Sequence, residues 1–405
     1  MSTLKVDAIR HNSATSDAIT TAADGTCTAK ITGRTGGGGL SNRNIIINGA
    51  MNVAQRGTSS TASGFGSVDR FAVYHGNVSE APTQFQSDVG FSDLPFTEQG
   101  ITKCLKVTNG NQTSTDNNDY IEINYKCEAQ DIRNSGWKYN SSSSFITLSY
   151  YVRSSVAQTY TAWITNRDGT RKNFVWTYAL SANTWTKITK VIPGDPNLTI
   201  DNDNGAAFEI WWQQYYGTNY TQASPPGNNT GGWVNHDNET VLDNTATWYE
   251  TDDATFELTG VQLEVGNHAS SFEHRIIADE LRRCQRYFYA HSGEGVNGSN
   301  SSTPDTVLNT GSCQASSSIT VAVVLPVPMR AVPTLYTTVT GGTRYRVNSA
   351  GANTNSGSDP VMYAAGSSHT TAVMDIGGFS GLVNNAACTV RRYQGSGILG
   401  FSAEL

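Results

Sequence analysis

The sequence predicts an all-β protein: a jelly-roll β-sandwich, a short helix and a smaller C-terminal β-sandwich, with an extended N-terminal arm. Composition is the first reason, because only 15% of the residues are charged and Gly, Ser, Thr and Asn take their place. Thr suits the pleated surface of a strand, whereas Gly and Asn suit turns. Short runs that alternate apolar and polar residues are the second reason, since a half-buried strand repeats every two residues.

Residues 1–40 are predicted to form an arm. Leu4, Val6 and Ile9 belong to a short run that mixes apolar and polar residues, and the rest is rich in Ser, Thr and Ala. Because so few large apolar residues cannot bury a core, we expect the arm to order on a partner or on sister chains. Glycines at 36–39 predict a hinge at its end. They do not indicate a phosphate loop, because no Lys-Ser or Lys-Thr follows.

Residues 41–275 are predicted to form the jelly roll. Alternating runs at 121–125, 145–152, 161–165 and 255–261 are separated by turn-rich segments. Many short strands with little intervening helix favour a sandwich, and a jelly roll is the natural candidate.

Residues 276–290 break the strand pattern. Ile277, Leu281, Cys284 and Phe288 recur at spacings of 4, 3 and 4, which places them on one face of a helix. Two interpretations stay open. The helix links the two sandwiches and packs on its own domain, or three copies of it pack around a symmetry axis of an oligomer.

Residues 291–405 are predicted to form the C-terminal β-sandwich. Strands resume at 319–325 after a polar stretch, and a proline-rich segment follows at 326–333. Proline cannot donate a ladder hydrogen bond, so this segment is expected at a sheet edge or at a crossing between strands.

Charge and residue type exclude several classes of function. A net charge of -7 and a pI near 5.5 speak against nucleic acid as a partner, which calls for clustered Lys and Arg. The sequence has no run of 18 or more apolar residues and no basic leader. We therefore expect that the protein is made in a cytoplasm and does not insert into a membrane. The scattered cysteines and histidines indicate neither a metal site nor a disulfide framework, and no cofactor motif is present.

Several motifs match a recurring set in structural proteins of tailed bacteriophages. Residues 44–57, N-I-I-I-N-G-A-M-N-V-A-Q-R-G, resemble the opening of the carbohydrate-binding-like jelly rolls of tail fibres. Residues 67–71 resemble the D-R-W motif that follows, with Phe71 in place of Trp. Residues 130–133, then Gly136 and the strand from Phe145, are similar to their E-D-V-R segment.

The later motifs follow in the same order. Residues 259–288 are close to a segment V-Q-L-E-x-G … F-E-x-R … E-L-x-x-C-Q-R-Y-Y of these proteins. Residues 326–334, P-V-P-M-R-A-V-P-T, and the terminal S-A-E-L fit the small domain that comes after it. The opening M-S-T-L-K-V resembles fibre-like proteins from phages of marine cyanobacteria.

The resemblance implies a tail-fibre subunit, a viral tail protein of the virion that is made in the host cytoplasm and mediates host attachment. It also implies a homo-oligomer, most often a homotrimer, that docks on other phage tail proteins through the arm. Leu4, Val6 and Ile9 are then the docking candidates. The expected ligand is a glycan on the host-cell surface, and no catalytic activity is expected.

An aromatic segment at 210–220 and the polar loop after it supply the glycan-contact candidates. Sugar rings stack on aromatic side chains while amides and carboxylates bond the hydroxyls. The candidates are Trp211, Tyr215, Tyr220, Trp233, Asn235 and Asp237. A strict two-residue period puts Ile210, Trp212 and Tyr216 on one face of the strand and Trp211 and Tyr215 on the other. Whether this segment is core or contact surface stays open.

Two other functions remain as alternatives. The first is a purely structural virion component, such as a head-decorating fibre or a tail scaffold, without receptor binding. The second is a polysaccharide depolymerase, which needs two carboxylates on either side of a glycosidic bond. Its candidates are Asp201, Asp203, Asp237, Glu239, Asp252 and Asp253.

Overall fold

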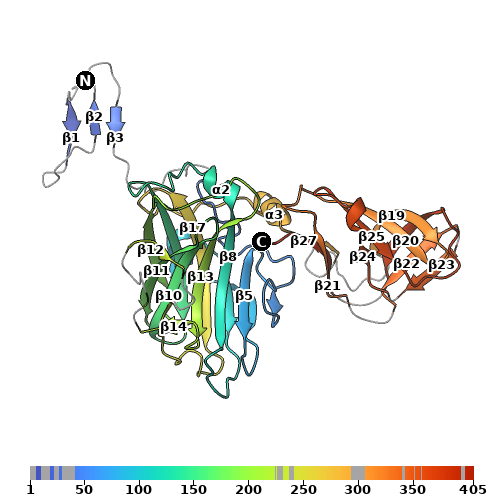
Figure 1. Cartoon of the computed structure of the whole chain (residues 1–405), viewed down its shortest axis with the longest axis horizontal. Helices are drawn as coiled ribbons and strands as arrows, with labels where there is room; N and C mark the ends of the chain where they lie inside the picture. Colours follow the sequence, from blue (N-terminus) through green and yellow to red (C-terminus); the bar gives the residue numbers. More distant parts are fainter. Residues whose placement is uncertain are drawn as a thin grey trace.

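The structure, a computed structural model, describes residues 6–10, 19–21, 27–29, 42–223, 225, 231–236, 241–292, 306–339, 343–350, 352–356, 358–393 and 397–405. The described residues are nearly all β, as the composition predicts (Figure 1). None of their helices is long and apolar enough to cross a membrane.

The N-terminal arm contains a small antiparallel sheet of β1 (Ala8–Ile9), β2 (Ile19–Thr21) and β3 (Cys27–Ala29). Val6 and Ile9 are 41% and 52% exposed, so neither is used in a core. Leu4 and the glycines at 36–39 lie outside the described residues. Docking of the arm on a partner stays a prediction.

The jelly roll is a sandwich of two antiparallel sheets of six strands each. The first sheet runs in the order β12 (Thr186–Pro193), β9 (Phe145–Ser154), β17 (Thr255–Val265), β7 (Lys103–Thr108), β6 (Thr83–Asp88), β4 (Ser59–Ser60). The second runs in the order β15 (Val234–Asn235), β11 (Lys172–Leu180), β10 (Gln158–Asn166), β13 (Ala206–Tyr216), β8 (Tyr120–Glu128), β5 (Phe71–Gly76).

The main core lies between these sheets. Alternate residues of each strand point into it, and its fully buried aromatic side chains include Tyr150, Trp176 and Trp212. The short elements α1 (Leu94–Gln99), α2 (Ala129–Arg133), β14 (Thr221–Gln222) and β16 (Val241–Leu242) connect the strands, and β14 pairs with β16 in parallel. Five cysteines, Cys104, Cys127, Cys284, Cys313 and Cys388, are buried and free.

Helix α3 (Ile277–Gln285) lies where the jelly roll meets the C-terminal sandwich (Figure 1). Cys284 is buried and Leu281 packs beside it against Ile47 and Val53 of the jelly roll, whereas Ile277 is 60% exposed. The helix ends before Phe288, which is the first residue of strand β18. The prediction that Phe288 lies on the helical face is therefore wrong. Of the four candidates for an oligomer axis, three are thus used inside the chain, which favours the linker interpretation.

The C-terminal unit has a smaller sheet and a larger one. The smaller sheet runs in the order β18 (Phe288–Ser292), β27 (Leu399–Ser402), β21 (Thr334–Thr337). The larger runs in the order β23 (Ala352–Ser356), β22 (Tyr345–Ser349), β26 (Ala387–Arg392), β19 (Thr306–Ala315), β20 (Ser318–Val324), β25 (Thr371–Ile376), β24 (Val361–Met362), with a 3-10 turn at η1 (Ala364–Gly366).

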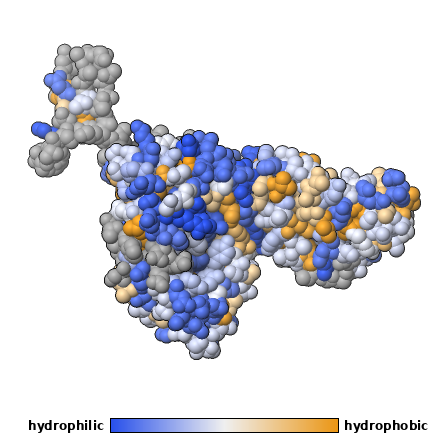
Figure 2. All heavy atoms as spheres, viewed as in Figure 1, coloured by the Kyte–Doolittle hydropathy of each residue, from blue (hydrophilic) through white to orange (hydrophobic). Residues whose placement is uncertain are grey.

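This unit has its own core, to which both sheets contribute. The unit begins at β18, slightly before the predicted boundary at residue 291. The proline-rich segment 326–333 lies between β20 of one sheet and β21 of the other, so the predicted crossing is confirmed. Figure 2 shows apolar atoms scattered over this part of the surface, where Val324 and Val361 are 78% and 66% exposed.

The residues that carry the phage resemblance gather at the junction of the two sandwiches. Arg56 and Arg70 both pair with Glu404 from the end of the chain, and all three side chains are almost completely buried. The guanidinium of Arg56 lies 3.5 Å from the ring centre of Phe288, and that of Arg70 lies 3.4 Å from that of Tyr287. These motifs therefore build the contact between domains.

Other motif residues extend the same junction. Arg330, from the P-V-P-M-R-A motif, donates to the backbone oxygens of Ala403, Glu404 and Asn204 at 2.8 to 2.9 Å. Arg286, from the C-Q-R-Y-F motif, pairs with the buried Glu128 at 2.7 Å. The side chains of Arg330 and Arg286 thus hold the two sandwiches together.

Candidate functional site

The candidate site is the face of the β15–β5 sheet that points away from the main core, called here the outer face. Strand pairing fixes a row of side chains across it: Val175, Trp163, Trp211, Asn124 and Ala72 are successive partners on β11, β10, β13, β8 and β5. Each residue of this row is preceded and followed in its strand by residues of the main core. The alternation that fills the core therefore also places the row on the outer face.

Two tryptophans form the centre of this row. The ring centres of Trp163 and Trp211 lie 5.7 Å apart with 12° between their planes, and Tyr216 meets Trp163 edge-on at 5.7 Å. Trp163 is 6% exposed, whereas Trp211 and Tyr216 are half-buried. Val241 of β16 packs on the same cluster. The outer face thus has an aromatic surface that Val241 partly covers.

A β-bulge in β13 decides which tyrosine joins the cluster. The pairing with β8 shifts between Gln213 and Tyr215, so Gln214 is an extra residue and the faces exchange after it. Tyr215 therefore turns into the main core, where its ring stacks on Tyr249 at 4.2 Å. The prediction that Tyr215 shares a face with Trp211 is wrong, and Tyr216 takes that place.

Buried polar atoms without a partner lie beside the aromatic cluster. Gln213 is 1% exposed, and neither its amide oxygen nor its amide nitrogen meets a hydrogen-bond partner among the described residues. The same holds for Oδ1 of Asn124 and Nε1 of Trp211. Buried polar atoms are normally satisfied, and each unsatisfied one costs about 1 to 3 kcal/mol. The four atoms on this face offer a polar ligand two donors and two acceptors.

Two carboxylates flank these atoms. Glu209 pairs with Lys126 at 3.4 Å and with Arg167 at 2.9 Å. Glu122 accepts a hydrogen bond from the hydroxyl of Tyr216, and burial, followed by the charge of Glu209, raises its pKa well above the ordinary value. Burial disfavours the charged form, so Glu122 holds a proton more firmly than an exposed carboxylate does.

The other predicted glycan contacts are divided. Tyr220 is half-buried and packs against Tyr120 and Tyr216, near the aromatic cluster. The prediction that Trp233 contacts a glycan is wrong. Trp233 is 8% exposed, packs in the main core and donates from Nε1 to the backbone oxygen of Pro193. Asn235 is exposed on the edge strand β15. Asp237 lies outside the described residues.

Four residues of the site were not among the candidates, namely Trp163, Gln213, Glu122 and Asn124. The alternating runs at 161–165 and 121–125 already place Trp163, Glu122 and Asn124 on the polar faces of their strands. A tryptophan on a polar face was therefore a usable signal. The pairing of β10, β13 and β8, which joins these residues, has no local signal because it depends on residues distant in sequence.

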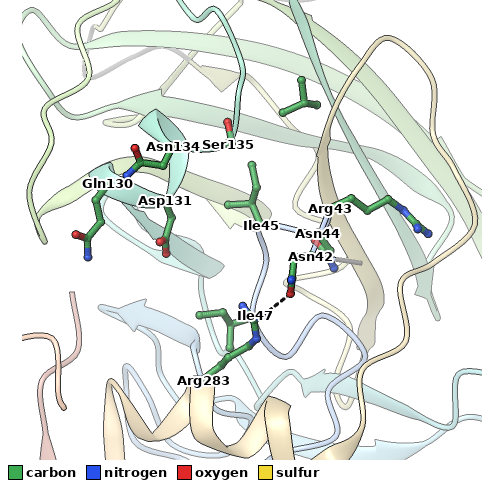
Figure 3. A pocket seen from close by; sticks show the side chains of 11 residues that line it. Asn42, Arg43, Asn44, Ile45, Ile47, Gln130, Asp131, Asn134, Ser135 and Arg283 are labelled. Carbon is green, nitrogen blue, oxygen red and sulfur yellow. Dashed lines mark hydrogen bonds between the residues drawn. The ribbon is translucent and has the colours of Figure 1, made fainter. Parts of the chain in front are cut away.

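A pocket of about 490 Å³ lies elsewhere, where the chain enters the jelly roll (Figure 3). Asp131 of α2 and Arg283 of α3 approach it from opposite sides, and Arg283 donates to Asn42 at 2.7 Å. Its lining includes no aromatic residue. It therefore lacks a flat apolar surface for a sugar ring.

Of the acidic residues named for a depolymerase, the structure describes Asp201, Asp203, Asp252 and Asp253. Asp203 accepts from the backbone nitrogen of Gly205 at 2.9 Å in an Asx turn. Asp252 and Asp253 line a different pocket together with Glu80. Glu239, like Asp237, lies outside the described residues.

On the opposite sheet, Trp185 is a weaker candidate. It is 7% exposed and its Nε1 also meets no partner within the described chain. However, the guanidinium of Arg153 lies 4.8 Å from its ring centre and is held by Glu257. The charged group therefore occupies the surface that a sugar would need.

No protein-family model and no curated protein matches the chain. Among solved structures, it is similar to a family 11 carbohydrate-binding module from Clostridium thermocellum in complex with a mixed-linked tetrasaccharide, at 12% identity over 54% of this chain and 98% of that one, with a TM-score of 0.26. It is also similar to the N-terminal cellulose-binding domain of Cellulomonas fimi β-1,4-glucanase C, at 11% identity over 53% and 97%, with a TM-score of 0.23.

Proposed function

We propose that the chain is a glycan-binding subunit of a phage tail fibre and that the outer face of its jelly roll holds the glycan. One observation carries the proposal of glycan binding: stacked indoles lie beside buried amides that have no partner, on one sheet face. Aromatic planes bind the C–H faces of sugars, and amides bind their hydroxyls. The phage setting is supported by the motifs alone.

Assembly into a homotrimer and docking through the arm belong to the same proposal. The exposure of Val6 and Ile9, 41% and 52%, supports such docking. The affinity of each glycan site in a fibre is expected to be weak, and several copies acting together strengthen attachment. Antibody labelling of virions tests the setting, and labelling of heads would contradict it.

A purely structural role is the second candidate, and a specific observation favours it. The residues that carry the resemblance, including Arg56, Arg70, Arg330 and Glu404, build the junction between domains and leave the outer face to unrelated residues. The motifs thus support the architecture of an appendage independently of any ligand.

The variant Trp211→Ala separates the two candidates. Losing the half-buried indole should weaken binding to host-cell envelope polysaccharide at least tenfold, which corresponds to about 1.4 kcal/mol. Phe91→Ala is the matched control, because Phe91 is a 77% exposed aromatic residue that is not on the outer face. Calorimetric titration of both folded variants provides the measurement. Equal affinities of the two variants would show that Trp211 does not contact the glycan, no binding by the wild type would favour the structural role, and release of reducing ends would reveal a depolymerase.

A further inference from the structure

We infer that the outer face selects uncharged sugars, whose hydroxyls it recognises with Gln213, Asn124 and Trp211. The inference rests on the proposed glycan binding and specifies the class of glycan. Gln213 and Trp211 point to the same side of β13 and are about 7 Å apart along it. Asn124 is the direct neighbour of Trp211 on β8. A sugar ring that covers the indole can thus direct its hydroxyls toward both amides.

The unpartnered atoms match hydroxyls in kind. They comprise two donors, Nε2 of Gln213 and Nε1 of Trp211, and two acceptors, Oε1 of Gln213 and Oδ1 of Asn124. A hydroxyl both donates and accepts, so a set of sugar hydroxyls can satisfy all four. An ionised carboxylate or a sulfate only accepts. Such an anion would leave Oε1 of Gln213 and Oδ1 of Asn124 without a donor, because its own oxygens would face these two acceptors.

The charges of the face favour the same class. Lys126 and Arg167, the cations beside β13, both pair with the buried Glu209. Glu122 lies opposite Gln213 and already accepts the hydroxyl of Tyr216. An anionic sugar would therefore have to compete with Glu209 for these two cations, whereas an uncharged sugar leaves both pairs in place.

Access to the amides requires a small rearrangement. Gln213 and Asn124 are 1% and 0% exposed, so half-buried side chains of the face must move aside. Tyr216 is the side chain that we assign to this step, because its hydroxyl is fixed by a single hydrogen bond to Glu122. A sugar hydroxyl can replace the phenol as the partner of that carboxyl group.

The test is titration of the full chain with neutral polysaccharides (mixed-linked β-glucan, dextran and galactomannan) and acidic ones (alginate, polygalacturonate and heparan sulfate). We expect binding of at least one neutral polymer and at least tenfold weaker binding of the acidic ones. Gln213→Leu should reduce the neutral affinity at least tenfold without lowering Tm, because it removes two unsatisfied buried atoms. Gln314→Leu, at an exposed glutamine of the C-terminal sandwich, is the control.

The possible outcomes are distinct. Binding of acidic polymers alone would overturn the inference and leave glycan binding intact. Full affinity of Gln213→Leu for the neutral polymer would overturn the assigned role of Gln213. Binding of neither class by a folded protein would contradict both this inference and the proposed glycan binding.

Discussion

Asp69 at the junction and Gln213 on the outer face are two buried polar side chains that differ in how well they are satisfied. At the junction, Asp69 accepts from the backbone and the side chain of Gln55 and lies 4.0 Å from Arg56. On the outer face, Gln213 has no partner among the described residues. Satisfied networks stabilise a fold, whereas unsatisfied groups at a face indicate a ligand. The two side chains therefore call for different experiments.

Asp69 predicts a pH dependence of stability. Burial raises its pKa to about 6 from 3.8, although Arg56 opposes this. The folded state therefore holds the proton of Asp69 more firmly than the unfolded state does. The contribution of Asp69 to the free energy of unfolding is greatest below about pH 4. This contribution falls by about 3 kcal/mol as the pH rises through about 6, and it stays constant above that.

Urea unfolding between pH 4 and 6.5 measures this fall. In Asp69→Asn the contribution should vanish, whatever the absolute stability of the variant. Asp88→Asn is the control, because the side chain of Asp88 is 82% exposed. A fall of the same size in Asp69→Asn and in the wild type would show that Asp69 does not cause it.

Strand β13 shows what the sequence could and could not predict about an element. The alternation places Ile210 and Trp212 on one face and Trp211 on the other, and the structure shows that the face of Ile210 and Trp212 lies in the core. After Gln213 the predicted faces are reversed, because the bulge adds a residue that no turn or glycine signals. The opposite faces of this strand up to Gln213 could thus be predicted from the local pattern. The pairing that assembles the site depends on distant residues, and it could not.

Deleting Gln214 tests the bulge. Without the extra residue, Tyr215 must leave its stack on Tyr249, or the rest of the strand must shift register. We expect a loss of about 3 to 5 kcal/mol in the free energy of unfolding, as for removal of a buried aromatic side chain. Gln214→Ala keeps the residue and the register but removes its buried side chain and the hydrogen bond to the backbone oxygen of Trp212, and should cost less. Equal losses in the two variants would contradict the account.

The whole molecule depends on the junction between its two sandwiches. The chain crosses from the jelly roll through α3, and its last residues return to pair with the jelly roll. Glu404 neutralises two arginines that come from separate motifs, so the phage-like motifs, distant in sequence, converge on a single buried contact. We expect the jelly roll and the C-terminal sandwich to unfold together because this contact is shared.

Glu404→Gln tests that coupling. Removing the carboxylate leaves Arg56 and Arg70 buried with less compensation, which should cost about 3 to 5 kcal/mol. Scanning calorimetry should show one transition for the wild type and, for the variant, a lower Tm or two transitions. Asp359→Asn, which breaks the more exposed pair of Asp359 with Arg344, should have little effect. A Tm in Glu404→Gln equal to that of the wild type would contradict the role of the junction.

The most direct test of the glycan site is an NMR titration of the indole N–H signals. Assignment by Trp→Phe variants identifies each of the eight tryptophans. During titration with the neutral oligosaccharide that binds most tightly, the Nε1 signal of Trp211 should shift strongly, because that N–H gains a partner. The signal of Trp185, on the opposite sheet and covered by Arg153, should stay in place. A shift of Trp185 with Trp211 unchanged would contradict the assignment of the outer face as the glycan site.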